Sequence, residues 1–282
     1  MANTYDADLV VDRLADQAIL VLQNKLAPLS AFSTDFGVDV LRPRATVQVE
    51  KSGTPATVQT NPTNYESGDT TNTNVAVSVS EKSVSFNVSS QELMQGHKLE
   101  TKAANNLHGL ADSVWDVAVA LLDESVFTNT VVVAAEADLD SDDLQTGWAS
   151  IAKSPQKHVV LSGAGFANFL PTNRESFNPG AGAYGFDGMH LATKWDAAQD
   201  ANTRGFFAGP NAIACAAGLP EISAPVRNQL DDVRVIEIPG LGISVQMCIW
   251  GSSASRATWV SYGVMFGAAV GDVSALTLYQ TS

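Results

Sequence analysis

Residues 90–124 read SQELMQGHKLETKAANNLHGLADSVWDVAVALLDE and carry the most regular pattern in the chain. Apolar side chains recur at intervals of three and four residues for nearly three heptads, which is the spacing of one face of an amphipathic helix. The stripe consists of Ala104, Leu107, Ala111, Val114, Ala118 and Leu121, widened by Leu110, Val117 and Leu122. Ser89 and Glu92 have capping-box spacing, and no proline interrupts the segment. We therefore predict a single helix over about residues 90–124.

A helix of this length constrains the shape of the whole chain. About 35 residues at a rise of 1.5 Å per residue extend roughly 52 Å. A compact sphere built from 282 residues has a diameter of about 50 Å. One helix would cross the entire sphere, so we expect a flattened or elongated subunit, a shape typical of proteins that assemble.

Strand patterns precede the helix. Val47 and Val49 alternate with polar residues, and so do Val75, Val77 and Val79. This period of two predicts strands with one apolar face. A third run, at Val84, Phe86 and Val88, moves the apolar side chains from odd to even positions. The change predicts a bend or bulge across Ser80–Ser83.

The 22 residues from Gly53 to Asn74 separate the first two strands and are polar throughout. They include seven Thr and four Asn, and their only sizeable apolar side chains are Val58 and Tyr65. A segment of this composition has too little apolar surface to form a core of its own. Because compact domains seldom carry so long a loop, the segment is either disordered or a hairpin arm that rests on another surface. The flanking strands favour the arm.

Helical spacing is also present at residues 6–26, where aspartates occupy the opposite face and Pro28 closes the segment. We interpret this helix as a short acidic N-terminal arm. Pro239-Gly240 predicts a turn. In the second half we predict a helix from Asp140 or Ser141 through Ala152, a short helix at Phe166–Leu170, and strands at His158–Leu161, Gly188–Thr193, Phe206–Cys215, Val233–Ile238, Ile243–Ile249 and within Thr258–Leu278.

Composition excludes several classes of protein. The net charge is −14, with 16% charged and 45% hydrophobic residues. The apolar content argues against a disordered acidic protein, and the sign of the charge argues against a basic nucleic-acid groove. No apolar run approaches the length needed to span a bilayer, and the N-terminus lacks a signal-peptide pattern. The two cysteines, Cys215 and Cys248, are too few for a disulfide framework. We expect folding in a cytoplasm and no membrane partner.

No catalytic, metal or cofactor site is expected from the motifs. The turn Ser162-Gly-Ala-Gly-Phe-Ala-Asn168 follows a predicted strand, but Asn168 stands where a dinucleotide fingerprint has its third glycine. We interpret it as a tight strand-to-helix turn. The acidic run at Asp138–Asp143 lacks the glycine and terminal glutamate of a calcium loop. It fits a helix N-terminus, where the dipole favours acids. His158 and His190 have no visible ligand partners in the sequence.

Three basic residues stand out at the root of the predicted arm: Arg42, Arg44 and Lys51. They are either ordinary surface charges or contacts to acidic residues on a neighbouring copy. The acidic residues that we nominate for this contact are Asp6, Asp8, Asp12 and Asp16. Charge complementarity of this kind mainly sets specificity and register.

The order of these parts resembles the major capsid proteins of tailed bacteriophages, which have the Hong Kong 97-type fold. An N-terminal arm, a long polar two-stranded loop, an unusually long helix, a mixed region and a strand-forming C-terminus follow one another in that family. Three stretches add to the resemblance: Lys157–Gly163 with Phe166–Leu170, Phe186–Thr193, and Gly205–Ala214. The resemblance covers essentially the whole chain.

The resemblance implies an α+β phage capsid fold with an N-arm at 1–44 and an extended β-hairpin, the E-loop, at 45–80. The peripheral domain is expected at 81–138 and 258–282, with the spine helix at about 90–124, and the axial domain mainly at 139–257. The E-loop of one subunit is expected to lie over its neighbour, which makes Val58 and Tyr65 interface residues beside Arg42, Arg44, Lys51, Asp6, Asp8 and Asp12.

The function that the resemblance implies is structural. Many copies, as hexamers and pentamers, would form the icosahedral shell enclosing double-stranded DNA without sequence-specific binding, in a virion made in a bacterial cytoplasm. A scaffolding protein or removed prosequence, a portal and a decoration protein are the implied partners. Some relatives cross-link Lys to Asn from the E-loop; Lys51 sits at the arm's base, so no cross-link is expected. Alternatives are an encapsulin-type nanocompartment, a nucleotide-dependent enzyme and an adhesin or fibre protein.

Overall fold

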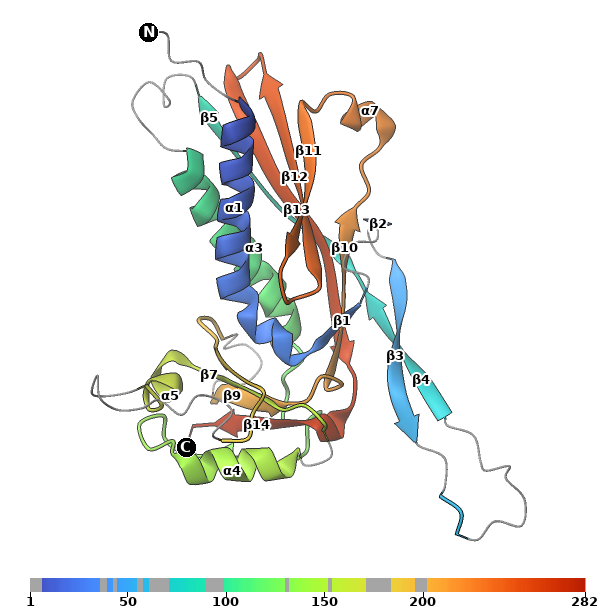
Figure 1. Ribbon diagram of the computed structural model, residues 1–282, viewed down its shortest axis with the longest axis vertical. Helices are drawn as coiled ribbons and strands as arrows, with labels where there is room; N and C mark the ends of the chain where they lie inside the picture. Colours follow the sequence, from blue (N-terminus) through green and yellow to red (C-terminus); the bar gives the residue numbers. More distant parts are fainter. Residues whose placement is uncertain are drawn as a thin grey trace.

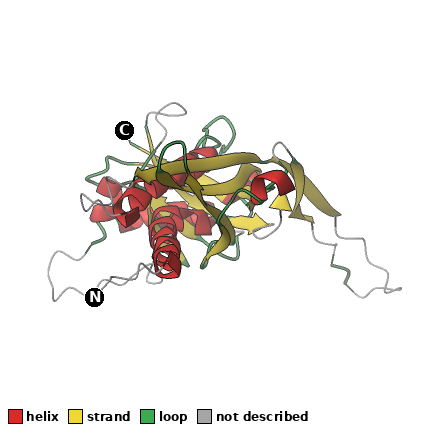
Figure 2. Cartoon of the chain, turned by 90° about the horizontal axis from the view of Figure 1, so that it is seen from above, coloured by secondary structure: helices red, strands yellow, loops and turns green. Residues whose placement is uncertain are grey.

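The structure is a computed structural model that describes residues 7–35, 40–42, 45–54, 58–60, 71–89, 99–129, 132–151, 154–170, 184–195 and 202–281. Two sheets, two long helices and a projecting hairpin make up this part of the chain (Figure 1). Seen from above, most helices gather toward one end and the hairpin strands lie at the opposite end (Figure 2). The described part is therefore elongated, as expected.

The first sheet has seven strands and is built around the long strand β13. Its main order is β1 (Ser33–Asp35), β10 (Ile213–Pro220), β13 (Ala257–Val270), β12 (Ile243–Ser252) and β11 (Asp232–Ile238). The strand β5 (Ser80–Ser89) pairs antiparallel with β13, and β2 (Val40–Leu41) pairs parallel with β10. The β11–β12 turn contains Gly240 and Gly242, both with positive φ, which confirms the predicted Pro239-Gly240 turn.

Helices α1 (Ala7–Leu26) and α3 (Leu99–Val119) pack together on one face of this sheet (Figure 1). Their apolar stripes and the inward side chains of the sheet form one core. Buried members include Leu14, Ala18, Leu22 and Leu26 of α1, Leu107, Leu110, Val114 and Ala118 of α3, and Phe86, Met247, Val260, Tyr262 and Phe266 of the sheet. Inside this core the Tyr262 hydroxyl donates to the carbonyl oxygen of Leu14 at 3.2 Å.

The predicted long helix is confirmed over Leu99–Val119, and residues 90–98, with Glu92 of the proposed capping box, lie outside the described ranges. At its C-terminal end the prediction is five residues too long. There the backbone tightens into three-residue turns: Leu121 N donates to Ala118 O and Leu122 N to Val119 O. These bonds satisfy helix-terminal carbonyls without a proline. The 21 helical residues span about 32 Å.

Residues 7–35 do not form the separate N-terminal arm that the sequence predicts. The helix α1 runs over the predicted range and stops at Leu26, but it packs into the chain's own core rather than standing apart. It is followed by the 3-10 helix η1 (Ala27–Ala31) and by β1, an edge strand of the first sheet. The physical reason is the apolar stripe of α1, which gains most by burial against α3.

The second sheet has the order β6 (Val132–Val133), β14 (Leu276–Gln280), β9 (Thr203–Ala208), β7 (His158–Leu161) and β8 (Gly188–Leu191). The helix α4 (Ser141–Ser150) and the short helix α5 (Gly163–Ala167) pack against it, and Leu144 of α4 and Phe166 of α5 join the same small core. Side chains alternate along β9: Phe206 joins the main core, whereas Phe207 joins a smaller core with Leu144 and Tyr279. Because β9 contributes to both cores, the second sheet is packed directly onto the first layer.

Two predicted boundaries are wrong. The apolar run Phe206–Cys215, expected as one strand, is divided between β9 and β10, which lie in different sheets. Gly209-Pro210 breaks it, and a turn is closed by Ala212 N donating to Gly209 O at 3.0 Å. The predicted domain division places residues 258–282 with the long helix, yet β14 pairs with β9 in the second sheet. Conversely β11 and β12 belong to the first sheet. Periodicity carries no information about which sheet a strand joins.

Leu107→Ala should strongly destabilise the fold, because Leu107 is fully buried in the α1–α3 core. We expect a loss of about 2–5 kcal/mol in the free energy of unfolding, measured by urea denaturation of the purified chain. Leu20→Ala is the matched control, since Leu20 lies on α1 but is 59% exposed; its change should stay within about 0.5 kcal/mol. Equal losses in the two variants would contradict this core.

Candidate subunit interfaces

A two-stranded hairpin, called the arm here, projects away from the body (Figure 1). It consists of β3 (Thr46–Thr54) and β4 (Thr71–Ser78), paired antiparallel from Thr46–Ser78 to Thr54–Thr71. The paired strands confirm the predicted arm over these residues. Residues 55–57 and 61–70, which include Tyr65, lie outside the described ranges.

The root of the arm packs on the face of the first sheet that is opposite to the helices. Val49, Val77 and Val79 are buried there against Ala216 of β10 and Met265 of β13. Val47 and Val75 join them as half-buried neighbours. The alternation of valines seen in the sequence therefore buries one face of the arm, but only near its base.

At the arm root the backbones of β4 and β13 lie close together, and this approach depends on Gly267. A Cβ atom on Gly267 of β13 would lie 2.3 Å from the carbonyl oxygen of Ser78, at the end of β4. The chain then leaves the arm at Val79, whose N–H donates to Ala45 O at 3.0 Å, and continues as β5 on the edge of β13. The predicted bend lies at Val79, just before the range Ser80–Ser83.

Farther from the body the arm is polar and exposed. Gln48, Glu50, Thr73 and Asn74 are exposed, and Val58 at the far end is 90% exposed. A two-stranded hairpin without a covering layer is marginally stable in water. Because these outer side chains are exposed, a partner surface elsewhere would stabilise the arm.

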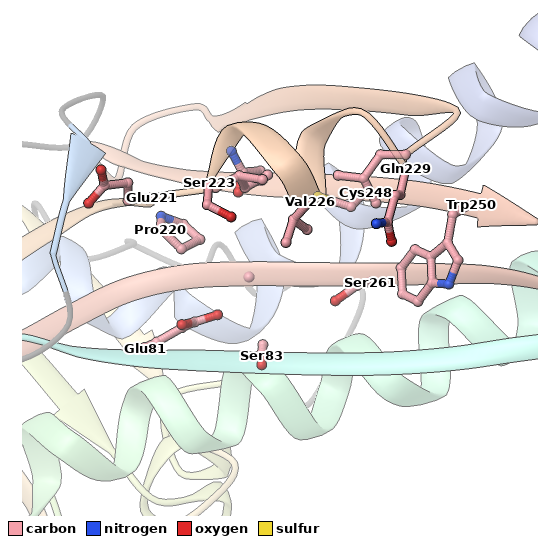
Figure 3. Close-up of a pocket in the computed structure, with 14 residues that line it drawn as sticks. Glu81, Ser83, Pro220, Glu221, Ser223, Val226, Gln229, Cys248, Trp250 and Ser261 are labelled. Carbon is pink, nitrogen blue, oxygen red and sulfur yellow. The ribbon is translucent and has the colours of Figure 1, made fainter.

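A groove of about 470 Å³ lies on the same face of the first sheet, next to the arm root (Figure 3). Its floor comes from β5, β12 and β13, with Ser83, Gln246 and Ser261 among the side chains. Its wall comes from the loop after β10 and the short helix α7 (Ala224–Arg227), which contributes Val226. None of the described helices other than α7 covers this part of the face.

Two tryptophans extend this open face. Trp250 of β12 and Trp259 of β13 are cross-strand partners, and their rings stack at 5.9 Å with an angle of 10°. Both are only half-buried, so each leaves part of a large aromatic ring exposed on this face. Cys248 lines the groove beside Trp250 (Figure 3). Sequence reasoning missed this face, and the alternation Gln246, Cys248, Trp250 was the signal that could have found it.

The charged residues predicted to meet across subunits differ in where they lie and in what they contact. Arg42 is exposed and its Nε donates to Glu221 Oε2 of the same chain at 3.1 Å. Asp12 pairs with Arg234 of β11 at 2.5 Å. Lys51 lies within β3, opposite Thr73. For Arg44, Tyr65 and Asp6 the positions lie outside the described ranges, and Asp8 is placed only as part of the α1 backbone. The structure therefore brings none of the described acidic and basic candidates together within one chain.

The acidic run at Asp138–Asp143 and the turn at Ser162–Asn168 each supply the cap of a helix in the structure. Asp140 caps α4 by accepting from Asp142 N and Asp143 N, while Asp143 accepts from Asp140 N in a capping box. Ser162 caps α5 by accepting from Gly165 N at 3.3 Å. The start of α4 agrees with the prediction. The short helix α5 begins at Gly163, three residues before the predicted Phe166, because Ser162 caps it. In the described part of the chain, no group of three or more His, Cys, Asp or Glu could hold a metal ion, and no helix there is long and apolar enough to cross a membrane.

Solved structures show what the fold resembles. The virus-like particle from Pyrococcus furiosus matches with a TM-score of 0.50 and 10% identity, over 95% of this chain and 98% of that chain. The capsid of the cyanophage P-SCSP1u matches at 0.49 with 10% identity, over 88% and 86%. The structure titled Microbacterium phage Oxtober96 matches at 0.49 with 14% identity, over 91% of both chains. The particle match confirms the predicted α+β fold class. No protein-family model and no curated protein matches the chain.

Gly267→Ala should displace the arm root, because its methyl group would collide with the backbone of Ser78. We expect a loss of about 1–3 kcal/mol in the free energy of unfolding, measured by urea denaturation. In Gly109→Ala the added methyl meets nothing within 4 Å on the exposed face of α3, so this control should gain about 0.5–1 kcal/mol. A neutral Gly267→Ala would show that the arm root does not approach β13 this closely.

Proposed function

We propose that this chain is the major capsid protein of a tailed bacteriophage, whose copies assemble as hexamers and pentamers into an icosahedral shell around double-stranded DNA. The observation that carries the proposal is the arm: a paired hairpin whose described outer side chains Gln48, Thr73 and Asn74 are exposed, with Val58 90% exposed. The match to a particle-forming protein over 95% of the chain supports it. A shell function is structural, and no catalytic role is proposed.

The arm needs a partner surface, and a second copy of the chain offers one. The groove and the open face beside it carry hydroxyl and amide side chains around two half-buried tryptophans. The distal arm carries Thr, Asn and Gln, which can hydrogen-bond to such a surface. We therefore place the arm of one subunit over the first sheet of its neighbour. Each subunit would then both offer and receive one arm, an arrangement that forms rings when its rotation closes.

The layers divide the roles in the shell. The first sheet with α1 and α3 corresponds to the proposed peripheral domain, and the second sheet with α4 and α5 corresponds to the proposed axial domain. A net charge of −14 suits a container, since an acidic wall does not bind the enclosed DNA tightly. A scaffolding protein, a portal and a decoration protein remain partners that we propose by resemblance, as does synthesis in a bacterial cytoplasm.

Removing the distal arm should abolish the shell and spare the fold. The variant deletes residues 55–70 and joins Thr54 to Thr71, which are paired in the hairpin, through Asn-Gly, a two-residue turn suited to antiparallel strands. The full chain, expressed with its scaffold if it needs one, should give large closed particles by sedimentation and electron microscopy. The deleted chain should give small soluble species with an unchanged circular dichroism spectrum.

Particle assembly and particle contents distinguish the proposed capsid protein from a nanocompartment shell protein. Closed particles from the deleted chain, or no particles from the full chain under any condition, would contradict the proposal. Particles purified from infected cells after nuclease treatment should contain protected double-stranded DNA. Protein cargo in place of DNA would favour the nanocompartment instead.

Charge reversal at the arm root tests the proposed contact of Arg42 and Arg44 with acidic residues of a neighbour, for which Asp6 and Asp8 are our candidates. Arg42→Glu with Arg44→Glu should reduce particle yield at least tenfold, measured by sedimentation. The exposed Arg42–Glu221 pair is worth at most about 1 kcal/mol, so the subunit should still fold. Arg42→Lys with Arg44→Lys keeps the charge and should assemble normally; normal assembly of the reversed variant would exclude these contacts.

A further inference from the structure

Two histidines meet at the contact between the two layers. His158 on β7 and His190 on β8 lie on adjacent parallel strands of the second sheet, and η1, which follows α1 in the first layer, packs against both strands. Ser30 of η1 lies 3.2 Å from His190, measured from Oγ to Nε2. The contact of these three side chains, called the joint here, spans the boundary between the layers.

The rings face each other through their nitrogens. His158 Nδ1 lies 3.3 Å from His190 Nε2, while the ring centroids are 5.6 Å apart and the ring planes differ by 23°. The centroids are well beyond the nitrogen–nitrogen distance, so the near edges of the rings meet and their faces do not overlap. This is the arrangement of an N–H···N hydrogen bond, in which one nitrogen carries a proton and the other does not.

The hydrogen bonds of Ser30 indicate which of the two facing histidine nitrogens carries the proton. The Ser30 hydroxyl donates to the carbonyl oxygen of Ala27 at 2.6 Å. Its oxygen is then left to accept, so His190 Nε2 is the donor to Ser30. In this assignment the same N–H is shared with His158 Nδ1, which is then an unprotonated acceptor, so His158 is neutral when the joint is closed. His190 is neutral as well, because burial lowers its pKa to about 4.

On the side of Gly188 the two rings lie close to the β8 backbone. Gly188 is the β8 partner of His158, and a Cβ atom there would lie 2.5 Å from His190 Nε2 and 2.7 Å from His158 Nδ1. Only glycine at this position lets the two rings approach.

Few charges face the joint from the packed elements. Neither η1 nor α5 carries a titratable side chain. Arg204 on β9 lies 3.9 Å from Glu136, and Lys157 donates to Trp148 O. Asp187 is the one carboxylate that acts on His158, and it raises the pKa of that imidazole, but burial dominates and lowers it. Burial, followed by the charge of His158, lowers the pKa of His190 to about 4.

We propose that this joint is a proton-sensitive latch between the two layers, closed by neutral histidines and opened when His158 takes up a proton at Nδ1. Protonation there would set two N–H groups against each other and leave a buried charge. The repulsion would displace the His190 ring and break its hydrogen bond to Ser30, which is the contact between the layers. The proposal concerns the isolated chain and is independent of the proposed function.

The direction of the pH effect follows from the lowered pKa values. An opened or unfolded state titrates near the ordinary pKa of about 6.5 and binds more protons than the closed state. The closed joint is therefore most stable above that pKa and loses stability as the pH falls from about 6.5 toward 4. The opened fraction should grow about tenfold for each pH unit per uncoupled histidine.

Amide hydrogen exchange of the full chain tests the latch. At pH 5, after correction for intrinsic rates, segments 27–32 and 188–192 should exchange at least tenfold faster in the wild type than in His158→Asn/His190→Gln. These amides retain an acceptor and a donor in place of the two ring nitrogens and do not titrate. At pH 7.5 the two proteins should exchange alike, and residues 243–252 of β12 should show no difference at either pH.

Two further variants keep the test decisive. Gly188→Ala should open the joint at pH 7.5 already and add little on acidification. His108→Gln, a change at an exposed histidine on α3, should keep the wild-type response. The same acid response in the wild type and the double variant would overturn the latch, as would acceleration that spreads equally to β12.

Discussion

A two-stranded hairpin can bury one face at its root but cannot bury itself along its length. In this chain the valine face of the arm is covered only where Val49 and Val77 meet β10 and β13, and the strands continue beyond that cover as a polar ribbon. The elongated shape, the open sheet face and the proposed assembly all follow from this constraint. A hairpin of this kind becomes fully stabilised when another surface supplies the missing layer.

The body that carries the arm is held as one unit by a core shared between its two sheets. Phe206 stacks on Phe32 at 5.5 Å, and Trp115 of α3 donates from its indole nitrogen to Lys194 O at 2.7 Å. These contacts connect the second sheet to the first layer, beside the histidine joint.

Much of this fold was predictable because its signals are local. The stripe around Leu107 gave the central part of α3, the alternating valines gave the hairpin, and Asp140 gave the start of α4. Other features depend on which distant segments meet. The pairing of His158 with His190, 32 residues apart, and of Trp250 with Trp259 requires strand register. The charged candidates rest on sequence position alone, and two of them, Arg42 at the arm root and Asp12 on α1, have partners in their own chain.

Amide hydrogen exchange along the arm is the most direct test of this account. The exchange of β3 and β4 beyond Val49 and Val75 would be compared between isolated subunits and assembled particles, with α3 as the internal reference. The account predicts fast exchange in the isolated chain and at least hundredfold slower exchange in the particle. Equal exchange of these strands in both states would contradict it, because the arm would then have found no partner surface on assembly.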